Sequence, residues 1–143
     1  MDQPEKRYLI FTLAGERFAL DLAYVAEVDE PLPAWPIPGA PEYYDGAINF
    51  HDNIVAVMNL SAFLGLPQSD RHEKLVVLTA RVAALAFLVE RVERIIPAEQ
   101  VIKDEHVQQK SRFGITNLTF NGGSALLLDA QGIVTAASEL IQV

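Results

Sequence analysis

The sequence predicts a mostly β protein built from small barrels, and three observations support this fold class. Short apolar runs separated by turn residues recur along all 143 residues, whereas long stretches with the period of an amphipathic helix are nearly absent. Successive runs lie close enough to pair as hairpins, which makes most of the pairing antiparallel. Half of the residues are hydrophobic, so an ample core can form. We expect about nine or ten strands and two short helices, in two small barrels rather than one sandwich.

The chain begins with a predicted hairpin. Residues 8–13 and 17–22 bracket the turn Ala14-Gly15-Glu16, and apolar side chains alternate along the second strand. Residues 25–28 indicate a further strand or sheet edge.

A segment with five prolines follows at residues 31–41. Because proline cannot donate a ladder hydrogen bond, the segment is expected to run as an extended connector. Trp35 and Ile37 would waste apolar surface in a flexible linker, so we expect this connector to pack down on the fold.

The segment from Gly46 to Pro67 is the most informative part of the chain. Residues 46–50 and 54–58 are apolar runs that flank His51, Asp52 and Asn53, and Asp and Asn tolerate the left-handed conformation of a tight turn. Asn59 can cap a short helix through Leu60, Phe63 and Leu64, which Gly65 and Pro67 then end.

The second half shows the same alternation of strands and turns. Polar residues 68–73 are the best internal boundary of a single domain over residues 1–143, whose terminal segments can cross from one barrel to the other. The elements expected beyond it are a hairpin (75–80 and 84–90, turning near Arg81-Val82), a strand (92–96), one helical turn (97–100), an exposed polar loop (103–111), a hairpin (115–120 and 124–128, turning at Asn121-Gly122-Gly123) and a C-terminal helix (133–141).

Composition excludes several classes of function. The formal net charge is −8 and the basic residues are scattered, so no stripe for nucleic acid is present. The absence of cysteine excludes disulfides and thiolate metal sites, and weakly favours the cytoplasm. The N-terminal residues resemble no secretory signal, and no apolar run is long enough for direct membrane insertion.

The residues that could carry chemistry do not gather into a recognisable motif. His51, His72 and His106 are far apart, so no metal site is expected. Gly123-Ser124 lacks the second glycine of a nucleophile elbow. Glu27, Asp29 and Glu30 could supply paired carboxylates for acid and base catalysis, but adjacent acids of this kind are most simply a solvated strand edge. Only Glu27 interrupts an apolar strand. We expect no cofactor and no enzyme activity, and a domain that binds other proteins.

The order of segments resembles the CheW family of chemotaxis coupling proteins over nearly the whole chain. The similar stretches begin at Phe11 (FTLAGERFALDL), Val25 (VAEV), Ile37 (IPGAPEYYDG), Val89 (VERVERI) and Leu126 (LLLD), with the Gly46-Ala-Ile-Asn hairpin and the Leu64-Gly-Leu-Pro stop. The resemblance implies two five-stranded SH3-like barrels around a shared core. It also implies a cytoplasmic adaptor that bridges the helical tip of a chemoreceptor to the histidine kinase CheA and assembles into rings in receptor arrays.

The resemblance further implies which residues face the receptor. By position, a groove between the barrels includes Val25, Glu27, Gly46, the turn at His51 and Asp52, and Leu75. Val25 and Leu75 would offer apolar contact to a receptor helix. The alternative for both is ordinary core.

The turn departs from the family pattern. Members of the family carry an arginine where this chain has His51, a glycine at Asp52 and a proline at Ala56. The resemblance implies that the arginine pairs with the glutamate at the position of Glu27, in a geometry that neutral imidazole cannot reproduce. Our hypothesis for this chain is that Glu27 and His51 form a pH-responsive pair, because histidine gains charge near neutrality.

Three functional alternatives follow. The first is a working adaptor between receptor and kinase. The second is a divergent CheW-like protein that serves another array, such as one for surface motility, or that binds without coupling. The third is a small β-barrel enzyme or ligand-binding protein, which a deep cavity with converging polar groups would favour.

Overall fold

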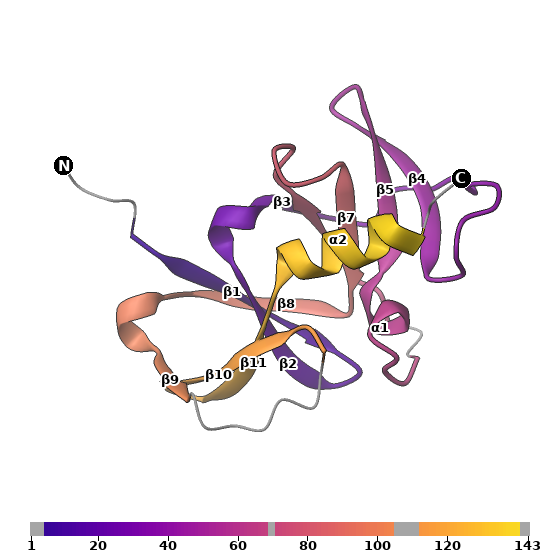
Figure 1. The fold of residues 1–143 in the computed structure, drawn as a ribbon. Helices are drawn as coiled ribbons and strands as arrows, with labels where there is room; N and C mark the ends of the chain where they lie inside the picture. The colour runs from indigo at the N-terminus through magenta and orange to yellow at the C-terminus, as the bar shows by residue number, and fades with distance from the viewer. Residues whose placement is uncertain (1–4, 69–70, 105–111, 141–143) are drawn as a thin grey trace.

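The computed structural model describes residues 5–68, 71–104 and 112–140, which form two β-sheets with few helices (Figure 1). The first sheet has the strand order β8-β1-β2-β11-β10-β9, and the second has the order β3-β6-β7-β5-β4. The predicted mostly β fold class is thereby confirmed. The strands are β1 (Arg7–Leu13), β2 (Glu16–Asp21), β3 (Val25–Asp29), β4 (Tyr44–Phe50), β5 (Asn53–Asn59), β6 (Lys74–Leu78), β7 (Leu85–Val89), β8 (Arg91–Pro97), β9 (Ile102–Asp104), β10 (Gly114–Phe120) and β11 (Gly123–Leu128).

The helices are short, as expected. They are the 3-10 turns η1 (Leu22–Tyr24) and η2 (Ala98–Gln100), and the α-helices α1 (Leu60–Phe63) and α2 (Ala130–Leu140). Asn59 caps α1 as predicted, since its side chain accepts a hydrogen bond from the Ala62 amide at 3.2 Å. Helix α2 begins at Ala130, earlier than expected, because the Asp129 carboxylate accepts from the Gly132 amide at 3.0 Å and supplies the N-terminal cap. None of the helices described is long and apolar enough to cross a membrane.

The first sheet has six strands rather than the expected five. The extra strand is β9, whose Lys103 and Asp104 were predicted to belong to a polar loop. Backbone pairing with β10 places them in a strand although all three residues of β9 are exposed. The remainder of that predicted loop, residues 105–111, lies outside the described residues.

The boundary expected at residues 68–73 does not lie between the two sheets. The strands that precede and follow it, β5 and β6, both belong to the second sheet. The chain passes from the first sheet to the second at η1 and returns between β7 and β8, so the terminal segments together build the first sheet. The expected boundary is therefore corrected to these two crossing points.

Buried apolar side chains of the described residues form three clusters, of which the largest lies between the sheets. This shared core takes Phe11 and Phe18 from the first sheet, Met58 and Phe87 from the second, and Ile133 from α2. Helix α2 lies across the strands of the second sheet in Figure 1 and closes this core. Each sheet also curls around an inner cluster of its own, so the shared core that the resemblance implies is present between two small curled sheets.

The proline-rich connector differs from expectation at its tryptophan. The Trp35 amide donates to the Ala47 carbonyl at 3.0 Å and the Ala47 amide donates to the Trp35 carbonyl at 2.8 Å, so the backbone is fixed on β4. The Trp35 side chain is nevertheless 48% exposed, while Ile37 is half-buried. The connector packs through its backbone, and the expected burial of the indole is wrong.

We predict that Tyr8→Phe leaves stability unchanged or raises it by up to about 1 kcal/mol. Tyr8 is fully buried in the inner cluster of the first sheet, and its hydroxyl has no hydrogen-bond partner among the residues that the structure describes. Removing an unpaired buried hydroxyl removes a desolvation cost without losing a bond. Urea unfolding of the two proteins measures the difference. A loss above about 1 kcal/mol would show that the hydroxyl has a partner, such as a buried water.

Candidate protein-binding surface

The two edge strands of the second sheet, β3 and β4, are brought together by one pair of side chains. The strand order leaves no backbone ladder between them in the part of the chain that the structure describes. His51, in the turn after β4, places its Nε2 atom 3.3 Å from the Glu27 carboxylate on β3. The side chains are 71% and 43% exposed, so solvent screens the pair and its contribution to stability is below about 1 kcal/mol.

The turn presents His51 through strained backbone. His51 and Asp52 have φ of 49° and 66°, in the left-handed region that non-glycine residues seldom adopt. The Asn53 side chain donates to the His51 carbonyl at 3.1 Å and fixes the turn. The Phe50 ring lies 4.3 Å from the imidazole in an edge-on arrangement, so the imidazole has an apolar support on one side and a carboxylate on the other.

Proximity of Glu27 and His51 was predicted and is confirmed. Whether protonation of the imidazole changes the pair stays a hypothesis. The neighbouring acids do not join the pair: the Asp29 side chain accepts from the Glu30 amide at 2.9 Å, and Glu30 pairs with Lys74 at 2.5 Å. These acids therefore do not converge on a common point, as expected of a solvated edge.

The other residues assigned to the groove lie less accessibly. Leu75 is 1% exposed and belongs to the inner cluster of the second sheet, so it is core and touches a partner only if the sheet opens. Gly46 is buried directly beneath the Trp35 carbonyl. Val25 is half-buried against the shared core, and Asp52 is exposed at the turn. The accessible surface thus consists of Glu27, His51 and Asp52, together with the exposed part of the half-buried Val25.

The sequence model of the CheW-like domain matches residues 7–138, which includes every strand of both sheets. The chain belongs to the CheW-like domain family. Members of this family are scaffold and adaptor proteins rather than enzymes, which confirms the expected lack of catalysis. Among the described residues, no group of three or more acidic or histidine side chains could hold a metal ion.

Named relatives agree with this assignment. The CheW-like chain is 26% identical over 110 residues to a probable chemotaxis protein CheW of Rhizobium etli, covering 76% of this chain and 68% of that protein. It is 26% identical over 105 residues to the chemotaxis protein CheW of Rhizobium meliloti, covering 72% and 65%. The matched part thus spans about two thirds of the length of these relatives.

A solved structure supports the fold. The scaffolding protein TtCheW from Thermoanaerobacter tengcongensis superimposes with a TM-score of 0.77 at 20% identity, covering 91% of this chain and 92% of that one. At this identity the likeness concerns the fold alone.

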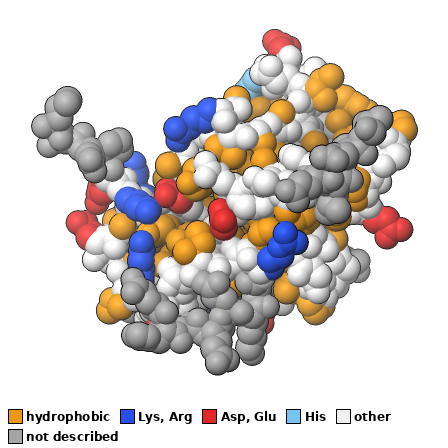
Figure 2. Space-filling model, in the orientation of Figure 1, with side chains coloured by type: hydrophobic (Ala, Val, Ile, Leu, Met, Phe, Trp, Pro, Cys, Tyr) orange, Lys and Arg blue, Asp and Glu red, His pale blue; other side chains and the backbone are white. Residues whose placement is uncertain are grey.

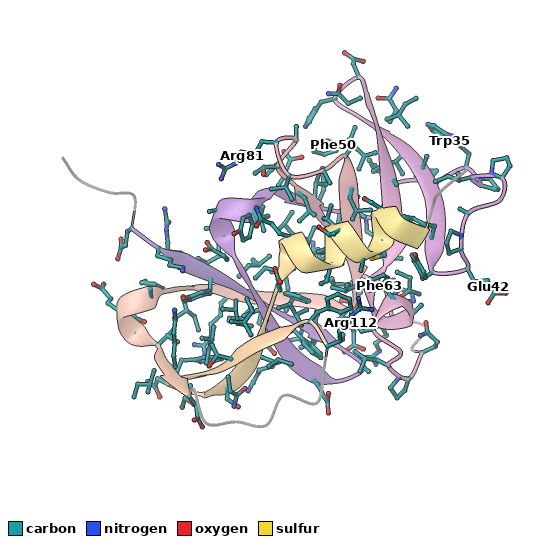
Figure 3. All side chains as sticks on the ribbon, in the orientation of Figure 1. Trp35, Glu42, Phe50, Phe63, Arg81 and Arg112 are labelled. Carbon is teal, nitrogen blue, oxygen red and sulfur yellow. The ribbon has the colours of Figure 1, made fainter. Side chains whose placement is uncertain are left out.

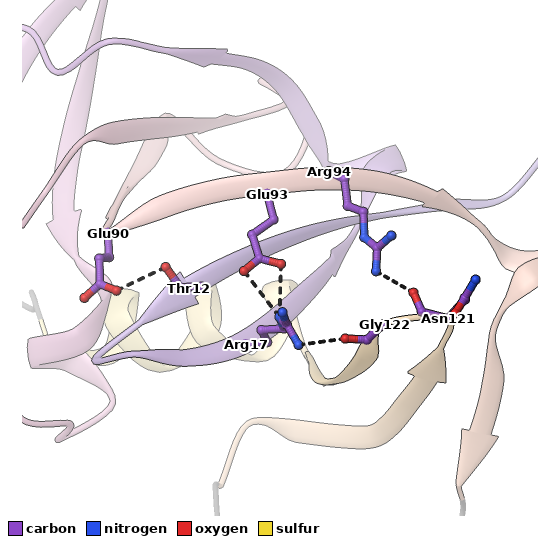
Figure 4. A network of polar contacts seen from close by, with 7 residues as sticks. All are labelled: Thr12, Arg17, Glu90, Glu93, Arg94, Asn121 and Gly122. Atoms are coloured by element: carbon purple, nitrogen blue, oxygen red, sulfur yellow. Dashed lines mark hydrogen bonds and ion pairs between the residues drawn. The ribbon is translucent and has the colours of Figure 1, made fainter.

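Arginines that sequence reasoning missed join strands of the first sheet of the CheW-like chain to one another and to the β10–β11 turn. Arg17 on β2 binds Glu93 on β8 through both carboxylate oxygens, at 3.0 and 3.3 Å, and donates to the Gly122 carbonyl at 3.2 Å (Figure 4). Arg94 on β8 donates to the Asn121 carbonyl at 2.8 Å. The β10–β11 turn is thereby fixed on β2 and β8. The one signal in the sequence was the tight turn itself, because the carbonyls of Asn121 and Gly122 there need hydrogen-bond donors from elsewhere in the chain.

An aromatic hollow between the two sheets was also missed. Its volume is about 380 Å³, and its lining comes from β2 and the β10–β11 hairpin on one side and from α1 and the residues after it on the other. Phe63 on α1 and Phe113 before β10 have ring centroids 5.3 Å apart, and Tyr43 meets Phe63 edge-on at 5.0 Å. The lining residues are Glu16, Phe18, Phe63, Leu64, Leu66, Arg112, Phe113 and Leu126.

Tyr44 beside this aromatic group gives the CheW-like chain a predicted alkaline transition. Burial, and next the neighbouring Tyr43 charge, raise the pKa of Tyr44 to about 12. The neutral phenol therefore stabilises the fold fully below pH 10, and this contribution is lost as the pH rises from 10 to 12. As the pH rises from 10 to 12, we expect the Tyr44→Phe variant to lose less stability than the wild-type protein. The ceiling on the difference is about 1.4 kcal/mol per pH unit, reduced by the partial exposure of the ring.

Urea unfolding at pH 9, 10 and 11 measures this effect. Both proteins share all lysine and arginine titrations, so the difference between their slopes reports Tyr44 together with its coupling to Tyr43. Equal slopes would contradict the prediction.

Proposed function

We propose that this protein is a cytoplasmic, non-catalytic adaptor that couples chemoreceptors to a CheA-type histidine kinase. The observation that carries the proposal is the match of the CheW-like domain to residues 7–138, since it takes in both sheets and the Glu27–His51 edge. Relatives named as chemotaxis proteins CheW support the same assignment.

The mechanism rests on contact rather than chemistry. A receptor helix would lie along the open edge between β3 and the β4–β5 turn, where Val25 offers apolar surface and Glu27, His51 and Asp52 offer polar groups that fix its register. The kinase would occupy a different surface, so that one adaptor transmits the receptor state to the kinase through two interfaces.

Reconstitution of kinase output tests the proposal. Receptor tips from the same organism, tethered to vesicles, are mixed with the cognate kinase, and ATP-dependent phosphorylation is followed with and without this protein. We expect the protein to change kinase output at least about fivefold, which is the lower end of typical coupling factors. Binding to both partners with unchanged output would favour a protein that binds without coupling, and binding to neither would overturn the proposal.

A second candidate is an adaptor of a non-flagellar array, such as one for surface motility. It is favoured by the turn itself, where His51 and Asp52 occupy left-handed backbone and replace the residues usual in the family. The same reconstitution with the kinase and receptors of each array in the organism separates the two, because output should change with one set only.

A further inference from the structure

A pocket where the chain crosses between the two sheets carries charges of both signs. Its volume is about 390 Å³, and it is lined by Asp21, Ala23, Tyr24, Arg81, Val82 and Gln131. These residues come from the end of β2, from η1, from the turn between β6 and β7, and from the first turn of α2. We call it the junction pocket, because η1 connects the first sheet to the second.

The turn that carries Arg81 is fixed on η1 by hydrogen bonds. The Thr79 amide donates to the Tyr24 carbonyl at 2.9 Å, and the Val82 amide donates to the Thr79 carbonyl at 2.9 Å. The Arg81 guanidinium donates to the Ala23 carbonyl at 3.3 Å, and Figure 3 shows Arg81 beside η1. The walls of the pocket are therefore in place before a ligand arrives, which keeps the ordering cost of binding small.

Arg81 keeps donors for a ligand. A guanidinium has five N–H groups, and the bond to Ala23 uses one of them. Arg81 takes part in no ion pair among the residues that the structure describes. Because a guanidinium binds a carboxylate through two parallel hydrogen bonds, this side of the pocket suits a carboxylate.

Asp21 supplies the opposite charge. Its side chain is 22% exposed, and one oxygen accepts from the Ala23 amide at 3.0 Å. The other oxygen lies 3.6 Å from the ammonium group of Lys6, which is too far for a direct hydrogen bond. Lys6 is 51% exposed, so an ammonium group on a ligand displaces it at little cost. A simple anion would meet Asp21 and a simple cation would meet Arg81, so a ligand with both charges matches the pocket best.

The remaining lining is apolar or neutral. Tyr24 and Val82 are half-buried against the shared core and give the pocket an apolar wall. Among the described residues, neither the Tyr24 hydroxyl nor the Gln131 side-chain amide has a hydrogen-bond partner, so both are available to a ligand. Figure 2 shows basic and acidic side chains on this face of the molecule with hydrophobic surface between them.

We propose that the junction pocket binds a free α-amino acid with an aliphatic side chain. Arg81 holds the carboxylate, Asp21 holds the ammonium group, and the side chain lies against Tyr24 and Val82. The bound amino acid contacts β2 of the first sheet and the β6–β7 turn of the second, so it links the two sheets at their junction. The proposal goes beyond the proposed function, because it needs neither receptor nor kinase.

Calorimetric titration of the whole protein with L-leucine tests the proposal. We expect a Kd on the order of 1 mM, because the pocket is open to solvent on one side. Two analogues each lack one charge: isocaproate has no ammonium group, and isoamylamine has no carboxylate. Each should bind at least about tenfold more weakly than leucine. Equal affinity for leucine and either analogue would overturn the proposal.

Substitutions test where the amino acid binds. Arg81→Gln removes the cation, and Asp21→Asn removes the anion but keeps an oxygen for the Ala23 amide. Each should weaken leucine binding at least about tenfold. The matched control is Arg91→Gln, which removes an exposed arginine from β8 and should leave the affinity unchanged. Absence of binding at about fiftyfold the expected Kd, or an affinity that Arg81→Gln does not change, would also overturn the proposal.

Discussion

Replacing Gly46 by alanine is expected to destabilise the protein by roughly 2–5 kcal/mol. Gly46 has φ of 145°, a conformation that is essentially restricted to glycine. A methyl group there would overlap the Trp35 carbonyl oxygen and come within 2.9 Å of its carbon. Since that carbonyl accepts a hydrogen bond from the Ala47 amide, the connector cannot move away without losing its attachment to β4.

Gly39→Ala is the matched control for this prediction. Gly39 lies in the same connector with φ of 77°, but nothing is within 4 Å of the position a methyl group would take. It should therefore cost only the backbone term of about 1–2 kcal/mol. Urea unfolding measures the stability of both variants. Trp35 fluorescence reports whether the connector has detached. Equal losses for the two variants would contradict the steric argument.

Reversing the charge at Glu27 is expected to give the largest functional effect. Glu27→Lys removes the contact with His51 that joins β3 to the β4–β5 turn, and it places two cationic groups together when the imidazole is protonated. Because the pair is exposed, we expect a loss of stability below about 1 kcal/mol but a loss of receptor-tip affinity of at least about tenfold. Titration of receptor tips followed by calorimetry measures the affinity.

Two further variants make this result interpretable. Glu99→Lys on η2 changes the net charge equally at an exposed site between β8 and β9 of the first sheet, and should leave receptor binding unchanged. His51→Arg should preserve or raise receptor affinity, because guanidinium can bind the Glu27 carboxylate through two hydrogen bonds. Equal loss of affinity in the Glu27 and Glu99 variants would point to general electrostatics rather than to a specific contact.

Much of the local structure follows from short-range rules. The β4–β5 hairpin, the Asn59 cap and the turn at Gly122 were each predicted from residues within a few positions of one another, and each is present. The meeting of Glu27 and His51 was also anticipated, but only through the resemblance to a family and not from the spacing of 24 residues. Sequence spacing by itself carries no information about such a contact.

The candidate site was predicted less well than the fold. Leu75 and Glu27 both belong to paired strands of the second sheet, β6 and β3, yet Leu75 is buried in the inner cluster and Glu27 is partly exposed. Sequence patterns showed both positions as members of strands, but the direction in which the sheet curls decides which side chain meets solvent. Trp35, an apolar residue that favours burial, is 48% exposed because its backbone and not its side chain attaches the connector to β4.

The sequence by itself determined most of the strands and turns, the Asn59 cap and the family, because these depend on local hydrogen bonding and on the order of segments. Only the tertiary structure decided the parallel pairing of β2 with β11 and of β5 with β7, and the clasp of Arg17 on Glu93, 76 residues away. It also decided that Trp35 of the proline-rich connector is 48% exposed and that an aromatic hollow lies between the sheets. These features join residues far apart in the chain, and their energies depend on how the two curled sheets pack around one core.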